Sequence, residues 1–155
     1  MKNEELISQL KKEFAVLKKE LGIKASFKEL DDVFFFRDFI LEKGFIGQKL
    51  HRDLSYRISS LFHNWCGVFQ NWLIPNNGSY VSMVESNCFD EADKEKIQKI
   101  LYDFMALTSK NSLEGFTGDK KSQGEYFDKS LLVWEQNKTY LTEFLRKANN
   151  KWSNP

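Results

Sequence analysis

The residues best able to do chemistry lie in one stretch of the chain whose apolar spacing is helical. An arginine offers a planar fork that fits a phosphate or a carboxylate, and a histidine beside hydroxyl groups can transfer protons near neutral pH. A helix would place five such side chains on one face, because they recur at intervals of four, three, one and three residues: Arg52, Tyr56, Ser59, Ser60 and His63. The pattern predicts either a solvated helix face with internal ion pairs or a site with acid–base or anion-binding chemistry.

The same stretch could also bind phosphates or RNA. In that interpretation Lys49, Arg52 and Arg57 contact the backbone and Tyr56 stacks on a base. The chain carries 23 Lys and Arg against 22 Asp and Glu, a formal net charge of +1. This balance excludes a nucleic-acid binder that works by bulk charge, although it leaves room for a local basic patch. Nucleic acid is therefore a partner that the net charge does not support.

Arg57 and His63, separated by five residues, resemble the Arg-x4-6-His motif of HEPN ribonucleases, which are small all-α proteins. The resemblance covers seven residues. It implies a metal-independent ribonuclease, usually a homodimer, in which Arg57 binds the scissile phosphate and His63 acts on the 2′-hydroxyl. On a continuous helix the two side chains are about 120° apart, so such a site needs a kink or a second subunit. This is the alternative function.

Metal ligands are few. His63 and Cys66 share a helix face and Cys88 lies farther along the chain, whereas a structural zinc site takes four such ligands. Only His51 or an acid remains to complete the set. We therefore expect no metal and no cofactor, and a buried Cys66 that behaves as a small hydrophobic residue.

The charged N-terminal segment has no apolar core of the kind that a signal peptide needs, so we expect a cytoplasmic protein with reduced thiols. The longest apolar runs, residues 33–36 and 39–41, are far shorter than a membrane span. We therefore expect no contact with a membrane.

Apolar spacing and scarce proline predict an all-α, single-domain bundle over residues 1–155, with about five helices and two long connecting loops. Ser26 and Glu29 form a capping-box pattern, Pro75 ends the longest helix, and residues 80–84 alternate like a short strand or extended loop. The expected helices lie near residues 3–21, 27–43, 48–74, 90–109 and 125–150, and the expected loops are 75–89 and 110–124.

Aromatic residues make up 15% of the chain, more than we expect one core of this size to shelter. Six residues of the first two expected helices are the candidates for contact with a partner: Phe35, Phe36, Phe39, Ile7, Leu10 and Phe14. The sequence therefore predicts a non-enzymatic protein–protein interaction protein, of an adaptor, assembly or inhibitor type. Its partner would be another protein or a second copy of the chain.

Overall fold

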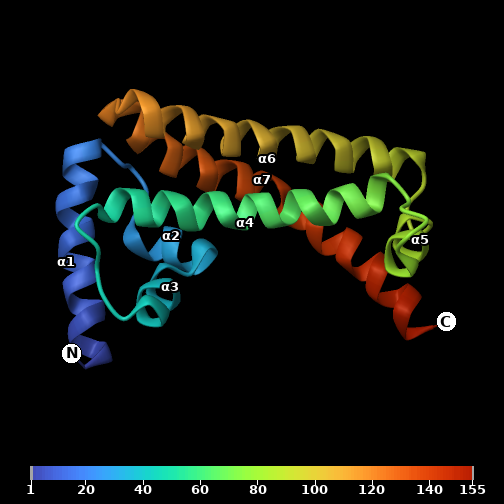
Figure 1. Ribbon diagram of the computed structural model, residues 1–155, viewed down its shortest axis with the longest axis horizontal. Helices are drawn as coiled ribbons and strands as arrows, with labels where there is room; N and C mark the ends of the chain where they lie inside the picture. The colour runs from blue at the N-terminus through green and yellow to red at the C-terminus, as the bar shows by residue number, and fades with distance from the viewer. Residues whose placement is uncertain (1, 155) are drawn as a thin grey trace. The chain divides into compact units, whose positions relative to one another are not determined.

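The computed structural model describes residues 2–154, and every regular element within them is a helix, which confirms the all-α prediction (Figure 1). The expectation of about five helices is wrong, because the described chain forms seven. They are α1 (Asn3–Leu21), α2 (Phe27–Phe34), α3 (Phe36–Lys43), α4 (Leu50–Leu73), α5 (Tyr80–Ser86), α6 (Glu91–Thr117) and α7 (Lys120–Ser153).

The expected helix over residues 27–43 is two helices, α2 and α3, that meet at Phe35. Phe35 has φ 55° and ψ 50°, a left-handed conformation that ends α2 and starts α3. This conformation costs a residue with a Cβ atom about 1–2 kcal/mol. The break was missed because the sequence has neither glycine nor proline there, the residues that usually mark one.

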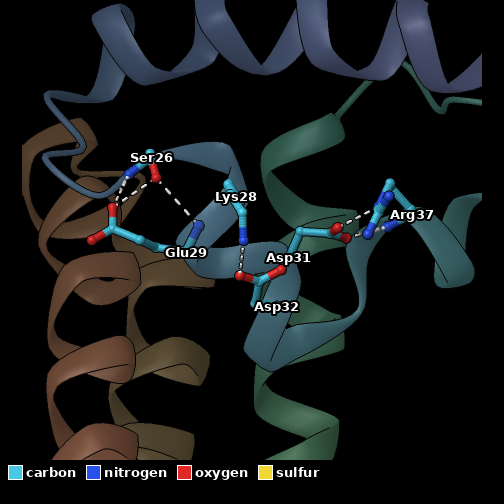
Figure 2. A network of polar contacts seen from close by, with 6 residues as sticks. All are labelled: Ser26, Lys28, Glu29, Asp31, Asp32 and Arg37. Atoms are coloured by element: carbon cyan, nitrogen blue, oxygen red, sulfur yellow. Dashed lines mark hydrogen bonds and ion pairs between the residues drawn. The ribbon is translucent and has the colours of Figure 1, made fainter.

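Asp31 connects the two sides of this break (Figure 2). Its carboxylate is almost completely buried and accepts hydrogen bonds from the backbone N–H of Arg37, at 2.8 Å, and from Nε of the same residue. At the other end of α2, the capping box is confirmed. The Ser26 Oγ accepts from the Glu29 N–H at 3.2 Å, and the Glu29 carboxylate accepts from the Ser26 N–H at 2.8 Å.

Neither expected long loop has the predicted form. Residues 75–89 contain α5, so the strand or extended segment expected over residues 80–84 is wrong. Residues 110–124 are almost entirely helical, because α6 runs to Thr117 and α7 begins at Lys120. The turn between them uses Gly118 at φ 68°, a conformation that glycine adopts without steric cost.

The chain forms two compact units, and α4, α6 and α7 each contribute to both. The first unit holds the described residues up to Leu61 together with Leu107–Leu132, and the second holds Phe62–Ala106 together with the described residues from Val133 onward. That residues 1–155 form a single domain stays a prediction. Within residues 2–154, no helix has both the length and the apolar character that a membrane span requires.

Aromatic rings fill the interior of each unit. In the first unit Phe36 lies 6.2 Å from Phe34 and 6.4 Å from Phe127, measured between ring centroids. In the second unit Phe62 packs edge-on against Phe104 at 4.6 Å. Such pairs stabilise a core by about 0.5–1.5 kcal/mol beyond the area that they bury.

Candidate functional site

Three of the six residues proposed for partner contact are core residues. Leu10, Phe14 and Phe36 are buried inside the first unit, so they are unavailable to a partner while that unit is folded. Phe36 was expected at the surface of one continuous helix, but the chain breaks at Phe35 and the Phe36 ring is buried.

The other three have partial access to solvent. Phe35 is 47% exposed, and Ile7 and Phe39 are half-buried. These residues alone do not form the broad aromatic surface that was expected on α1, α2 and α3.

The candidate polar residues of α4 have different environments. Arg57 is half-buried, and its Nε donates a hydrogen bond of 2.9 Å to the backbone carbonyl of Phe34. His63 is exposed. Arg57 therefore has a structural partner within the first unit, and the ribonuclease function stays a prediction. Lys49, Arg52 and Tyr56 are exposed, as an anion-binding role would need.

The two cysteines are free thiols. Cys66 is buried, and desolvation raises its pKa to about 11. Cys88 is half-buried, and burial together with the charge of Glu85 also raises its pKa. Among residues 2–154 no three His, Cys, Asp or Glu side chains gather as metal ligands would.

The most unusual surface is α5, where the polarity of the helix is inverted. Its serines, Ser82 and Ser86, face inward and are completely buried. Its apolar residues face solvent, with Tyr80 74% exposed and Val81 51% exposed, and Met83 is exposed as well. A surface helix normally buries its apolar stripe and exposes its polar one.

Hydrogen bonds explain why α5 packs in this orientation. The Ser79 Oγ caps the helix by accepting from the Ser82 N–H at 3.2 Å. The Ser82 Oγ accepts from the Asn76 N–H at 3.1 Å and lies 3.3 Å from the carbonyl oxygen of Asn71. The buried serine thus joins α5 to the end of α4, and this arrangement leaves the apolar side chains outside.

Tyr80 and Met83 form one wall of a groove between α5 and the C-terminal end of α7, which lie beside each other (Figure 1), whereas Val81 does not line this groove. The groove has a volume of about 360 Å³, within the range of small-ligand and side-chain pockets. Its lining consists of Tyr80, Met83, Val84, Asn87, Lys151 and Trp152.

The Glu85 carboxylate holds Trp152, the largest side chain of the groove, in place. The Glu85 Oε1 accepts a hydrogen bond of 3.0 Å from the indole N–H of Trp152. The Glu85 Oε2 accepts one of 2.9 Å from the indole N–H of Trp72, which is buried in the core of the second unit. The Trp152 ring is therefore positioned before any partner arrives, with the Tyr80 ring 6.4 Å away.

Lys151 provides the charge of the groove. Both carboxylate oxygens of Glu85 accept hydrogen bonds from the two indoles. Lys151 forms no ion pair with any residue that the structure describes. An apolar groove with one unpaired cation can bind a group that combines an apolar body with a carboxylate.

Sequence reasoning missed this groove because it assigned residues 75–89 to a loop. The sequence nevertheless contains a pattern that indicates a helix here. Ser79 is a good N-cap, and Ser82 and Ser86 are four residues apart among apolar residues, as on one face of a helix. Comparison of the chain with protein-family models, with curated proteins and with solved structures finds no match.

Proposed function

We propose that this chain is a non-enzymatic protein-interaction module that binds a peptide segment of another protein in the groove between α5 and α7. The observation that carries the proposal is the inverted polarity of α5, which buries Ser82 and Ser86 and exposes Tyr80, Val81 and Met83. Exposed apolar patches with polar surroundings are typical of protein-binding surfaces.

The composition of the groove supports a peptide as the occupant. Tyr, Trp and Met are enriched at protein interfaces, and a rigid aromatic side chain loses little entropy on binding. Trp152 is held by Glu85 and Tyr80 flanks it, so an inserted apolar side chain meets preformed walls. The proposed function is still the protein interaction that the sequence predicts, but the proposed binding site lies in the second unit instead of on α1–α3.

The unpaired Lys151 defines the second requirement. A peptide with a carboxylate next to its apolar anchor neutralises Lys151, whereas a basic peptide is repelled. We therefore infer that the partner segment is acidic and carries a Phe- or Leu-type anchor.

A panel of short synthetic peptides tests the proposal. The anchor is Phe, Leu or Ala, and the residue beside it is Asp, Asn or Lys. Calorimetry or NMR titration should detect binding of the peptides that combine Phe or Leu with Asp, and weaker or no binding of those with Ala or Lys. If none of the peptides binds, the proposal is wrong.

Three variants locate the binding. Trp152→Ala should weaken the affinity at least tenfold, and Lys151→Glu should favour the Lys-containing peptide over the Asp-containing one. Tyr102→Ala is the control, because Tyr102 is an exposed aromatic residue of the same unit that lies outside the groove. Equal binding by the wild type and Trp152→Ala would contradict the proposed site.

A further inference from the structure

A second cavity, in the first unit, is polar instead of aromatic. It lies among α4, α6 and α7 and has a volume of about 200 Å³. Its polar lining comes from His51, Arg52, Ser55, Asn111, Glu114 and Gln123. This volume is below the roughly 300–1,000 Å³ of pockets for drug-sized molecules, so the cavity suits a small metabolite better than a nucleotide.

Glu114 is the buried charge of this cavity. The residue is only 4% exposed. Its Oε1 accepts a hydrogen bond of 2.6 Å from Ser122 Oγ and lies 3.6 Å from Lys110 Nζ. Its Oε2 accepts no hydrogen bond from the residues that the structure describes. This oxygen is not among the fully buried atoms that lack a partner, so it has access to solvent and can accept a hydrogen bond from water or from a ligand.

Three other polar side chains of the cavity have no partner within the described residues, whereas the Ser55 Oγ donates to the His51 carbonyl at 2.6 Å. The Arg52 guanidinium forms no hydrogen bond or ion pair within residues 2–154, and neither do the side-chain amides of Asn111 and Gln123. Arg52 is exposed at the cavity while Glu114 is buried in it. The cavity therefore combines a carboxylate that can bind a cation, a guanidinium that can bind an anion, and two amides that can both donate and accept hydrogen bonds.

We propose that this cavity binds a free α-amino acid with a short polar side chain. The ligand ammonium donates to Glu114 Oε2, and the ligand carboxylate pairs with Arg52. Asn111 and Gln123 are the partners for its polar side chain. An anion alone would leave Glu114 Oε2 without a donor from the ligand, and a cation alone would leave Arg52 without a ligand acceptor, so a zwitterion is the ligand that uses both groups.

The electrostatics of Glu114 agree with this assignment. Burial raises the pKa of the Glu114 carboxyl, because desolvation disfavours its charged form. An ammonium group beside Oε2 restores the charged form. The nearby His51 has a pKa lowered chiefly by burial and secondarily by the charge of Arg52, so it is neutral at physiological pH and adds no competing positive charge.

Titration calorimetry with L-serine, L-asparagine and L-glutamine tests the proposal. At least one should bind saturably to the wild-type chain. Its N-acetyl derivative lacks the ammonium, and its amide lacks the carboxylate. Both should bind at least tenfold more weakly. If none of the three amino acids binds, the cavity holds water only and the proposal is overturned.

Two variants test the two contacts separately. Arg52→Ala changes an exposed residue, so it should fold normally and lose at least tenfold in affinity. Glu114→Gln should lose the same ligand, and circular dichroism will show whether it folds. Lys11→Ala is the matched control, because Lys11 is an exposed cation of the first unit that does not line the cavity. Arg52→Ala that binds as tightly as the wild type would overturn the proposal.

Discussion

A Cβ atom on Gly124 would lie 1.9 Å from the backbone carbonyl oxygen of Leu21. The first turns of α7 therefore touch the end of α1 without any side chain between the two backbones, and Gly124 is buried in this contact. Only glycine permits so close an approach of a helix to another backbone. This contact lies within the first unit, two residues after Ser122 of α7, which donates a hydrogen bond to Glu114 of α6.

Gly124→Ala should destabilise the protein by at least about 2 kcal/mol, because backbone must move to relieve the overlap. Chemical denaturation monitored by circular dichroism measures this change. Gly67→Ala is the control, since nothing lies within 4 Å of a Cβ at that exposed position of α4. It should stabilise the helix by about 0.5–1 kcal/mol. Similar effects of the two substitutions would contradict the close packing.

Gly124 also shows why part of the fold was not predicted. The loop expected over residues 110–124 contains Gly115, Gly118 and Gly124. Only Gly118 marks a turn. Gly124 lies inside α7 because tertiary packing requires a missing side chain, and local sequence does not distinguish this reason from flexibility.

The features that were predicted depend on local spacing. The helix over residues 3–21 and the capping box of Ser26 and Glu29 are confirmed because a heptad stripe and a cap involve only near neighbours. The break at Phe35 involves residues far apart in the sequence, such as Arg57 and the Phe34 carbonyl. The inverted α5 had a local signal in its serines, but its contact with α7, through Glu85 and Trp152, joins residues far apart in the sequence. The same holds for the two candidate sites, whose residues come from separate helices.

Asp31→Asn should destabilise the protein by about 2 kcal/mol, because it removes a charged acceptor from two hydrogen bonds to Arg37 in a buried position. Asp32→Asn is the adjacent control. Asp32 is exposed and forms only an i,i+4 ion pair with Lys28, so its loss should cost less than about 0.5 kcal/mol. Urea denaturation of both variants measures the difference. Equal costs would mean that Asp31 does not join α2 to α3.

The two thiols should differ in reactivity. With Cys66 buried and its pKa raised to about 11, roughly one molecule in a thousand carries the Cys66 thiolate at pH 8. Cys88 is half-buried and should react with a disulfide reagent in the native protein, slowly because its pKa is also raised. We expect Cys66 to be labelled only after unfolding in urea. Peptide mapping by mass spectrometry identifies the labelled residue, and native labelling of Cys66 as fast as Cys88 would contradict the expectation.

Glu114→Gln should change stability in a pH-dependent way. Burial raises the pKa of Glu114 in the folded chain above its unfolded value, so the folded chain holds this proton more tightly. The stabilising contribution of the protonated carboxyl is complete below the unfolded pKa of about 4.3 and is lost as the pH rises through the folded value. Glutamine does not titrate and can still accept from Ser122. Relative to the wild type, the variant should therefore gain stability between pH 4 and pH 7.5.

Glu29→Gln gives the opposite control for this measurement. Hydrogen bonds from Ser26 lower the pKa of Glu29 in the folded chain, so its contribution to stability is present above the unfolded pKa and lost as the pH falls through the folded one. Relative to the wild type, Glu29→Gln should lose stability over the same rise in pH. Urea denaturation at pH 4.0, 5.5 and 7.5 measures both variants. The two variants should therefore differ from the wild type in opposite directions as the pH rises. If their stability differences from the wild type changed with pH in the same way, burial of Glu114 would not control its protonation.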